Sequence, residues 1–160
     1  MQELYDDESK NILVVVDDGR RVTMSARPRS LPALDDDNRA FWTGGAEDQL
    51  MIYRCGECGC HVHPPLPRCL RCGEANVAPA PVSGKGRVAS FTVNHQAWLP
   101  DMKLPFIFGV VELVEQDELF VFTNFVDCDA DAISIGMPVE VVFEKHDDVW
   151  LPMFRPDGRA

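Results

Sequence analysis

Two short cysteine motifs constrain this chain more than any other feature. Cys55-Gly-Glu-Cys58 and Cys69-Leu-Arg-Cys72 are both CxxC pairs, and a glycine follows the second cysteine of each pair. A CxxC turn brings two sulfur atoms within reach of one ion, and the glycine permits the tight backbone turn. Four thiolates fill the tetrahedral coordination of zinc and leave no open position. The motifs therefore predict a structural Zn²⁺ site with Cys55, Cys58, Cys69 and Cys72 as ligands.

Other interpretations of these cysteines stay open at this point. A rubredoxin-like iron site would use the same four thiolates, although the segment has little around it to serve as an electron carrier. Two disulfides would suit an exported protein, but the acidic start of the chain lacks the features of a signal peptide. Cys60, His61 and His63 lie beside the first pair as rival ligands. We expect them instead to be ordinary residues of the first CxxC turn, or knuckle, and of the strand after it.

The charge of the chain limits its partners. Among its 160 residues, 15 Lys and Arg stand against 26 Asp and Glu, so the net charge is −11. Residues 81–160 hold six basic and thirteen acidic residues, which gives −7 for that part. Proteins that bind nucleic acids neutralise phosphates with basic side chains, so we expect no nucleic-acid partner.

The longest aliphatic run, Ile12 to Val16, is too short to span a bilayer. We expect a cytoplasmic protein with no membrane partner.

Residues 1–30 are predicted to form an N-terminal extension. An apolar run at residues 11–16 and a β-prone run at residues 20–24 flank Asp17-Asp18-Gly19. Asp-Gly between two such runs is typical of a β-hairpin. Residues 1–10 are acidic, and we expect a loose terminus there. Because an isolated hairpin is only marginally stable, this one should lean on the main domain or on a partner chain.

Residues 31–50 are predicted to form a linker and a short helix. The three aspartates at residues 35–37 suit a helix N-cap and first turn, where carboxylates satisfy free N–H groups. The helix should run through Phe41-Trp42 and end at Gly44-Gly45. Two large aromatic side chains on so short a helix must be buried against something. Phe41 and Trp42 are therefore candidates for a partner interface or for packing on the ribbon.

The remaining chain is predicted to be a zinc ribbon over residues 51–82 and a barrel over residues 83–160. Val, Phe, Ile and Thr dominate five segments beyond Ser83, as half-buried strands require. The predicted strands are 87–95, 106–115, 118–125, 138–144 and 149–154, with a helical turn over 127–136. Five strands with a helical piece between the third and fourth is the order of an OB-fold. The predicted fold is mainly β: an N-terminal β-hairpin and short helix, a four-cysteine zinc ribbon and a C-terminal five-stranded OB-fold barrel.

The ribbon and barrel together resemble domain-of-unknown-function family 35, a rubredoxin-like zinc ribbon followed by an OB-fold. The resemblance runs from Leu31 to about Pro156. Its motifs are the Phe41-Trp42 helix, Arg54-Cys-Gly-Glu-Cys-Gly, Pro65-Leu-Pro-Arg-Cys-Leu-Arg-Cys-Gly, Gly84-Lys-Gly-Arg-Val-Ala-Ser-Phe-Thr-Val-Asn-His95, Asp127-Cys-Asp-Ala-Asp, Ile135-Gly-Met-Pro-Val139 and Leu151-Pro-Met-Phe-Arg-Pro156. The hairpin over residues 11–24 departs from the family pattern and looks like an addition.

This resemblance implies a non-catalytic accessory subunit of a thiolase-fold enzyme that acts on acyl-CoA thioesters. Reactions associated with the family include thiolysis or condensation, HMG-CoA synthesis, acetyl transfer and retro-aldol cleavage of steroid side chains. The subunit is expected to stabilise the catalytic subunit and to help shape its CoA path. The family's metal ligands match Cys55, Cys58, Cys69 and Cys72. No catalytic residue of the thiolase partner can be carried over.

Outside the four metal ligands, the sequence contains few candidates for a catalytic or binding site. Cys128 lies between Asp127 and Asp129, and adjacent negative charge disfavours the nucleophilic thiolate. His95, at a strand end, is more often a structural group than an acid or base. Four residues form a hypothetical CoA-binding set: Lys85, Arg87, His95 and Trp98. The alternative function is that of a nucleic-acid-binding OB-fold and zinc ribbon with stacking aromatics, which the acidic balance disfavours.

Overall fold

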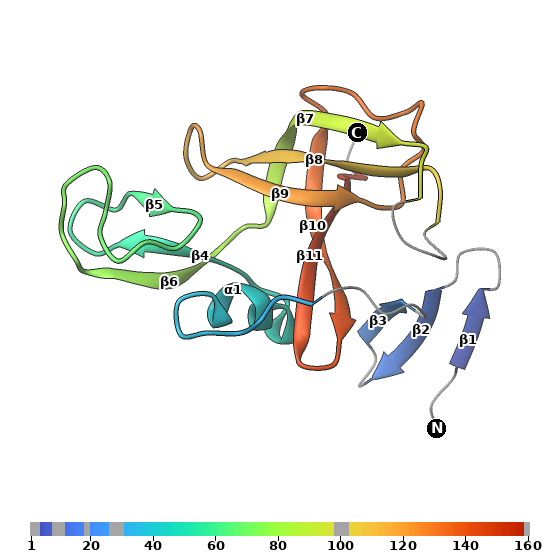
Figure 1. Cartoon of the computed structure of the whole chain (residues 1–160), viewed down its shortest axis with the longest axis horizontal. Coiled ribbons are helices and arrows are strands. Elements are labelled where there is room, and N and C mark those ends of the chain that lie inside the picture. The colour runs from blue at the N-terminus through green and yellow to red at the C-terminus, as the bar shows by residue number, and fades with distance from the viewer. Residues whose placement is uncertain (1–3, 8–11, 18–19, 26–30, 98–102, 159–160) are drawn as a thin grey trace.

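We describe the protein from a computed structural model, which covers residues 4–7, 12–17, 20–25, 31–97 and 103–158. It consists of a small three-stranded sheet at one end, a five-stranded barrel in the middle and three N-terminal strands at the other end (Figure 1). Within the described residues, no helix has the length and apolar character needed to cross a membrane.

The barrel has the strand order of an OB-fold. Its strands are β7 (Lys85–Asn94), β8 (Phe106–Leu113), β9 (Phe120–Phe125), β10 (Pro138–His146) and β11 (Val149–Pro156). Antiparallel pairing joins β7 to β8, β8 to β9 and β10 to β11. The parallel pairing of β9 with β11 and the antiparallel pairing of β7 with β10 close the barrel. The mainly β fold with a closed five-stranded barrel, predicted from the sequence, is confirmed.

One hydrophobic core fills the barrel and extends beyond it. Alternate residues of β8 and β9 point inward, so that Val111 and Val121 are fully buried while their neighbours face outward. Phe154 of β11 is also fully buried. The same cluster includes Leu50 and Ile52, which precede the first CxxC pair. The strand that leads into the cysteines is therefore anchored in the barrel core.

The segment between β9 and β10 differs from the prediction. Residues 126–137 form turns and contain no helix. Gly136 N–H donates to the Val88 carbonyl (2.7 Å), and Val88 N–H donates to the Met137 carbonyl (3.0 Å). Ile133 is buried in the core. Because these contacts tie the segment to β7, its backbone groups find partners outside a helix and the helical pattern is overridden.

The predicted helix exists but is short. In the turn just before it, Asp35 and Asn38 bond each other reciprocally, since each side-chain oxygen accepts the other residue's backbone N–H at 2.8 and 3.0 Å. Helix α1 (Arg39–Thr43) follows and passes into the 3₁₀ helix η1 (Gly44–Glu47). A Cβ on Gly45 would lie 2.6 Å from atoms of both Phe143 and Trp150. Glycine at this position therefore lets η1 lie directly on β10 and β11.

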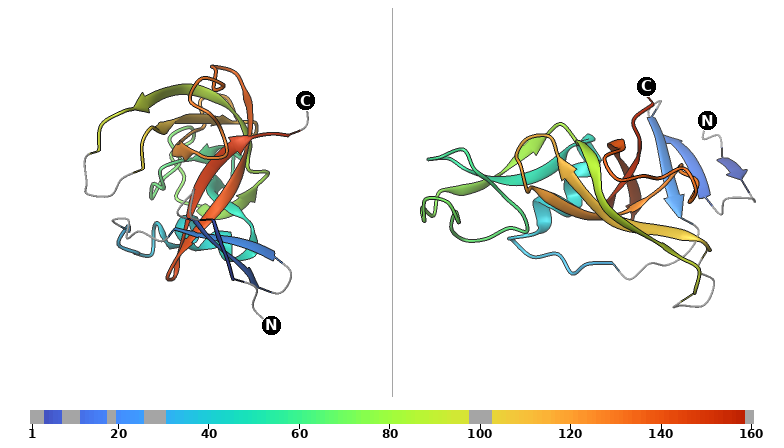
Figure 2. Two further views of the ribbon diagram at one scale, coloured as in Figure 1. Left: turned by 90° about the vertical axis from the view of Figure 1, so that its right-hand side faces the viewer. Right: turned by 90° about the horizontal axis from the view of Figure 1, so that it is seen from above.

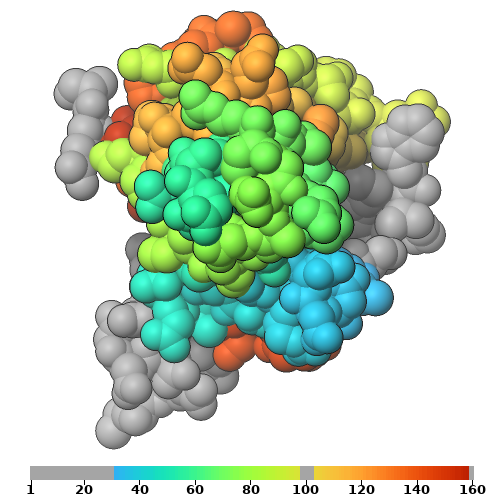
Figure 3. Space-filling model, turned by 90° about the vertical axis from the view of Figure 1, so that its left-hand side faces the viewer, coloured from blue at the N-terminus to red at the C-terminus, as the bar shows by residue number. Residues whose placement is uncertain are grey.

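The small sheet carries the cysteines. Strand β4 (Leu50–Cys55) pairs with β5 (His61–Val62) on one side and with β6 (Val77–Val82) on the other. Both pairings are antiparallel. Seen from this end of the molecule, the ribbon loops lie in front of the barrel (Figure 3).

The N-terminal strands correct one expectation. Strands β2 (Ile12–Asp17) and β3 (Arg20–Ser25) form the predicted antiparallel pair. Residues 4–7, expected to be part of a loose terminus, instead form strand β1 (Leu4–Asp7) against β2. Strand β3 pairs in parallel with the end of β10, so the hairpin leans on the barrel of its own chain. The view from above, on the right of Figure 2, shows these strands at the opposite end of the molecule from the ribbon. The isolated Leu4–Asp7 segment became a strand because β2 offers it a free edge.

Candidate functional site

The four cysteines of the CxxC motifs converge on one point. Their sulfur atoms all lie within 4.8 Å of one another. The sulfur atoms of Cys55 and Cys72 are 3.6 Å apart, and those of Cys58 and Cys69 are 3.5 Å apart. Zinc bound tetrahedrally at about 2.3 Å from each sulfur would separate two sulfurs by about 3.8 Å. The arrangement fits one four-coordinate ion with no position left for a substrate.

The two knuckles are built alike. Gly59 N–H donates to the Cys55 carbonyl and Gly73 N–H donates to the Cys69 carbonyl, each at 2.9 Å. Both glycines have positive φ, +72° and +80°, as the sequence motif predicts. In the second knuckle, Arg71 N–H points at the Cys69 sulfur (3.4 Å). Hydrogen bonds from the backbone of Cys72 and then Arg71 lower the pKa of the Cys69 thiol to about 6, whereas burial and the neighbouring sulfur atoms raise the pKa of the Cys72 thiol to about 12. These opposite shifts are those of thiols that crowd one point and share their protons.

The rival ligands lie outside this group. Burial, followed by the neighbouring Cys69 and Cys58, raises the pKa of the Cys60 thiol and disfavours its thiolate. The ring of His63 packs against Phe41, with ring centroids 4.9 Å apart, and burial lowers its pKa to about 4. Burial, followed by Arg54, also lowers the pKa of His61. These residues belong to the packing between ribbon, helix and barrel.

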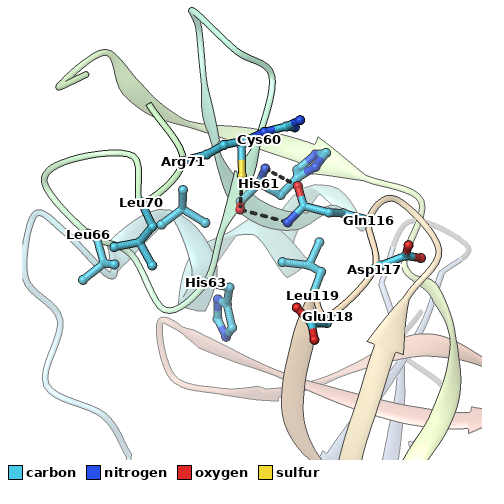
Figure 4. A pocket seen from close by; sticks show the side chains of 11 residues that line it. Cys60, His61, His63, Leu66, Leu70, Arg71, Gln116, Asp117, Glu118 and Leu119 are labelled. Carbon is cyan, nitrogen blue, oxygen red and sulfur yellow. Dashed lines mark hydrogen bonds between the residues drawn. The ribbon is translucent and has the colours of Figure 1, made fainter. Parts of the chain in front are cut away.

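A glutamine holds the ribbon against the barrel. The Gln116 side chain, at the turn after β8, accepts a hydrogen bond from His61 N–H (2.8 Å) and donates one to the His61 carbonyl (3.3 Å) (Figure 4). It thereby pairs with the free edge of β5 as a backbone strand would. Next to it, the Glu115 carboxylate accepts the Ser83 N–H at 2.6 Å, at the junction of ribbon and barrel. We call Glu115 and Gln116 the ribbon clamp. The sequence did not predict the ribbon clamp, because a Glu-Gln pair in a turn is not a recognisable motif.

A pocket of about 340 Å³ lies beside the ribbon clamp (Figure 4). The ribbon contributes its larger part, including His63, Leu66 and Leu70, and the turn between β8 and β9 supplies the opposite wall. Leu70 is 83% exposed. This mixture of apolar and charged lining contains no assembled pair of acid and base.

The structure does not bring the hypothetical CoA-binding set together. The Lys85 ammonium pairs with Asp157 (3.4 Å), and the Arg87 guanidinium donates to the Gly136 carbonyl (3.2 Å). His95 lies just past the other end of β7, whose ten residues span about 30 Å when extended. Trp98 lies outside the described residues. Lys85 and Arg87 therefore lie at the start of β7 and His95 lies beyond its other end, and CoA binding by this set stays a prediction.

The remaining candidates lie in packed surroundings. Phe41 is 5% exposed and belongs to the barrel core cluster, and Trp42 packs on that cluster with its ring edge-on to Phe41 (centroids 4.7 Å apart). Phe41 thus has a packing role in its own chain. Burial, followed by Asp129, raises the pKa of the Cys128 thiol, which disfavours a nucleophilic role.

Comparison with known proteins agrees with this architecture. Residues 42–78 match the model of the ChsH2 rubredoxin-like zinc ribbon domain, and residues 80–144 match the model of the ChsH2 C-terminal OB-fold domain. A DUF35 domain-containing scaffold protein of Methanothermobacter thermautotrophicus is 36% identical over 97 residues, which cover 58% of this chain and 69% of that protein. The chain belongs to the DUF35 family.

Two further relatives extend the comparison. A solved structure of an Ltp2-ChsH2(DUF35) aldolase is similar with a TM-score of 0.71 and 34% identity, covering 79% of this chain and 98% of that chain. A probable enoyl-CoA hydratase alpha subunit of Thermomonospora curvata is 39% identical over 132 residues, or 81% of this chain. This chain spans only 40% of that hydratase subunit's length.

Proposed function

We propose that this protein is a non-catalytic accessory subunit of a complex that acts on acyl-CoA thioesters, with a thiolase-fold protein as its catalytic partner. The observation that carries the proposal is a metal site saturated by four protein thiolates, Cys55, Cys58, Cys69 and Cys72. Such a site organises structure and leaves no position for substrate. The metal, when bound, supplies a fixed centre for both knuckles.

The chemistry of the other described residues supports the same role. Acyl transfer needs an activated nucleophile, a base and an oxyanion hole held together. Cys128 sits in the segment after β9 with a raised pKa, and His95 is exposed beyond the end of β7. Neither is assembled with the other groups that catalysis requires. A catalytic partner would supply them.

The names of the relatives support a complex and its substrate class. One relative is named a scaffold protein, one belongs to a two-component aldolase, and one is named an enoyl-CoA hydratase subunit. Because those reactions differ, we infer only two elements for this chain: a catalytic partner, which the scaffold and aldolase names support, and a CoA thioester, which the hydratase name supports. We propose a thiolase-fold partner on the strength of the family resemblance alone.

The test is to purify a tagged copy from its native cells and to identify stoichiometric companions by mass spectrometry. We expect a thiolase-fold protein at a fixed ratio, one zinc per tagged chain, and turnover of a CoA thioester by the complex but not by this chain. A Cys60→Ser copy is the control for the zinc content. It should still carry one zinc per chain, because Cys60 lies outside the metal group. A monomer that carries zinc and has no companion would contradict the proposal.

One observation favours the second candidate, nucleic-acid binding. Phe108 and Phe122 stack on the outer surface of β8 and β9, with ring centroids 6.3 Å apart. OB-folds bind oligonucleotides on this second and third strand. The net charge of −11 opposes it. Titration with labelled single-stranded DNA at low salt tests this candidate, and saturable binding would support it.

A further inference from the structure

Three phenylalanines lie on the outside of the barrel without cover from the described residues. Phe122 is 68% exposed, Phe108 41% and Phe120 39%. They belong to adjacent strands, β8 and β9, which run side by side in Figure 1. Val110 pairs directly with Phe122 between them. We call these four residues the phenylalanine face.

The phenylalanine face is not needed to fill the barrel. The inward positions of the same two strands hold Ile107, Val111, Val121 and Phe125, none more than 5% exposed. Most residues on both sides of this hairpin are therefore apolar, with Glu112 and Asn124 as the polar residues in register with the outer phenylalanines. A strand pair with one side in water normally alternates apolar and polar residues. At about 200 Å² a ring, the three exposed phenylalanines leave about 300 Å² of aromatic surface in water. Contiguous apolar patches of this size are often functional.

The neighbours of the face argue against a phosphate ligand. On β7, the residues in register with Val110 and Phe108 are the uncharged Ser90 and Thr92. Arg87 is in register with Glu112, and its guanidinium already donates to the Gly136 carbonyl. Stacking of bases is normally accompanied by cations that track the phosphate backbone. The aromatic rings are present here without that accompaniment.

The edge of the face is acidic. Glu112 is in register with Phe120, and the turn that joins the two strands carries Asp117 and Glu118, both exposed. Two copies of a chain with net charge −11 would repel each other at such an edge. A partner with an apolar centre and basic side chains around it would instead be attracted.

We propose that the phenylalanine face is a docking surface for the catalytic subunit, which meets it with an apolar patch bordered by Lys or Arg. This inference rests on the proposed function. The exposed rings supply less than the about 800 Å² per partner that a stable interface buries. They form its apolar centre, where aromatic anchors contribute most of the affinity.

The test uses the catalytic subunit identified in the native complex, purified apart from this chain. Phe122→Ser and Phe108→Ser should each weaken binding about 10- to 100-fold, which is the loss expected at a central aromatic anchor. Ile135→Ser is the matched control, because Ile135 is 63% exposed on the segment before β10. It should bind within twofold of the wild type. Circular dichroism and zinc content establish that each variant is folded.

A second measurement does not depend on weakening the interface. A benzophenone amino acid at position 122 should crosslink to the catalytic subunit on illumination, whereas the same group at position 135 should not. Normal affinity of both serine variants, or no crosslink from position 122 within an intact complex, overturns this inference and leaves the proposed function standing. If no catalytic subunit accompanies the chain, both fail.

Two other outcomes would assign the face to a different occupant. Self-association of the wild-type chain that Phe122→Ser abolishes would make the face a contact between two copies. Saturable binding of single-stranded DNA that is lost in Phe122→Ser would make it a nucleic-acid surface. Either result overturns docking of the catalytic subunit.

Discussion

The ribbon and the barrel of this protein are stabilised by different means. The barrel buries a large cluster of aliphatic and aromatic side chains, among them the fully buried Val111, Val121 and Phe154. Beyond Ile52, the ribbon buries only Cys55, Val62 and Cys69 among its hydrophobic residues. So few side chains cannot balance the entropy of ordering the loops around them. The ribbon therefore depends on its metal, and the barrel depends on apolar packing.

Strand β4 connects the metal-stabilised ribbon to the barrel that is stabilised by apolar packing. Its first half places Leu50 and Ile52 in the barrel core, and its last residue, Cys55, is a metal ligand. The ribbon clamp adds a second connection through Gln116 and His61. The ribbon can thus lose its own order while its base remains attached to the barrel.

Metal removal should have the largest effect and should act on one region only. We expect a strong chelator, or Cys58→Ser, to disorder residues 55–79 and to leave the barrel folded, because structural zinc contributes about 10–16 kcal/mol in small zinc domains. Amide NMR spectra before and after chelation report this, with Cys60→Ser as the control that keeps its zinc. Loss of the barrel signals at the same time would show that the two regions are not separate in stability.

A cavity in the barrel should have the next largest effect. Phe154→Ala removes a fully buried ring and is expected to lower the free energy of unfolding by about 3–5 kcal/mol. The matched control is Phe122→Ala, which removes the same ring from an exposed site and should cost less than about 1 kcal/mol. Urea unfolding followed by circular dichroism measures both. Equal losses in the two variants would contradict the assignment of inner and outer faces.

Breaking the ribbon clamp should destabilise the protein less than the cavity in the barrel does. Gln116→Ala removes two hydrogen bonds to His61, each worth about 1 kcal/mol net, so about 2 kcal/mol of coupling should be lost. Hydrogen exchange should speed up at His61 and Val62 while the β10 and β11 amides stay protected. Asp117→Ala, at the exposed neighbouring position, is the control. Unchanged exchange in β5 would show that the clamp does not hold the ribbon.

The smallest expected effect is a pH dependence from His63. Its pKa in the folded protein is about 4, below the ordinary value of 6.5, so on acidification the unfolded chain binds this proton first. Stability should therefore fall by about 1 kcal/mol between pH 7.5 and pH 5.5, relative to a His63→Phe variant. The variant keeps all four cysteines, so subtraction removes the pH dependence of metal binding. Parallel pH profiles for the two proteins would mean that His63 is not buried as a neutral ring.

The parts predicted correctly from sequence are those governed by local spacing. Each CxxC knuckle spans a few residues and needs glycine at a positive φ, so Cys55, Cys58, Cys69 and Cys72 were recognisable before any fold was known. The barrel strands were recognisable too, since β-branched and aromatic residues dominate them. The boundaries at residues 30, 50 and 82 remain predictions. The family models pass from the zinc ribbon to the OB-fold between residues 78 and 80.

Tertiary structure decided what depends on residues far apart in the chain. It separated His95 from Lys85 along one strand, turned Phe41 into the shared core, and replaced the helical turn predicted over 127–136 by turns tied to Val88. It also brought Gln116 to His61, a pairing across 55 positions that no local pattern encodes. The sequence by itself determined the metal site and the strands, because turn geometry and side-chain alternation are local. Closure of the barrel decided the clamp and the exposed phenylalanine face, because only the closed sheet defines which side of each strand faces inward.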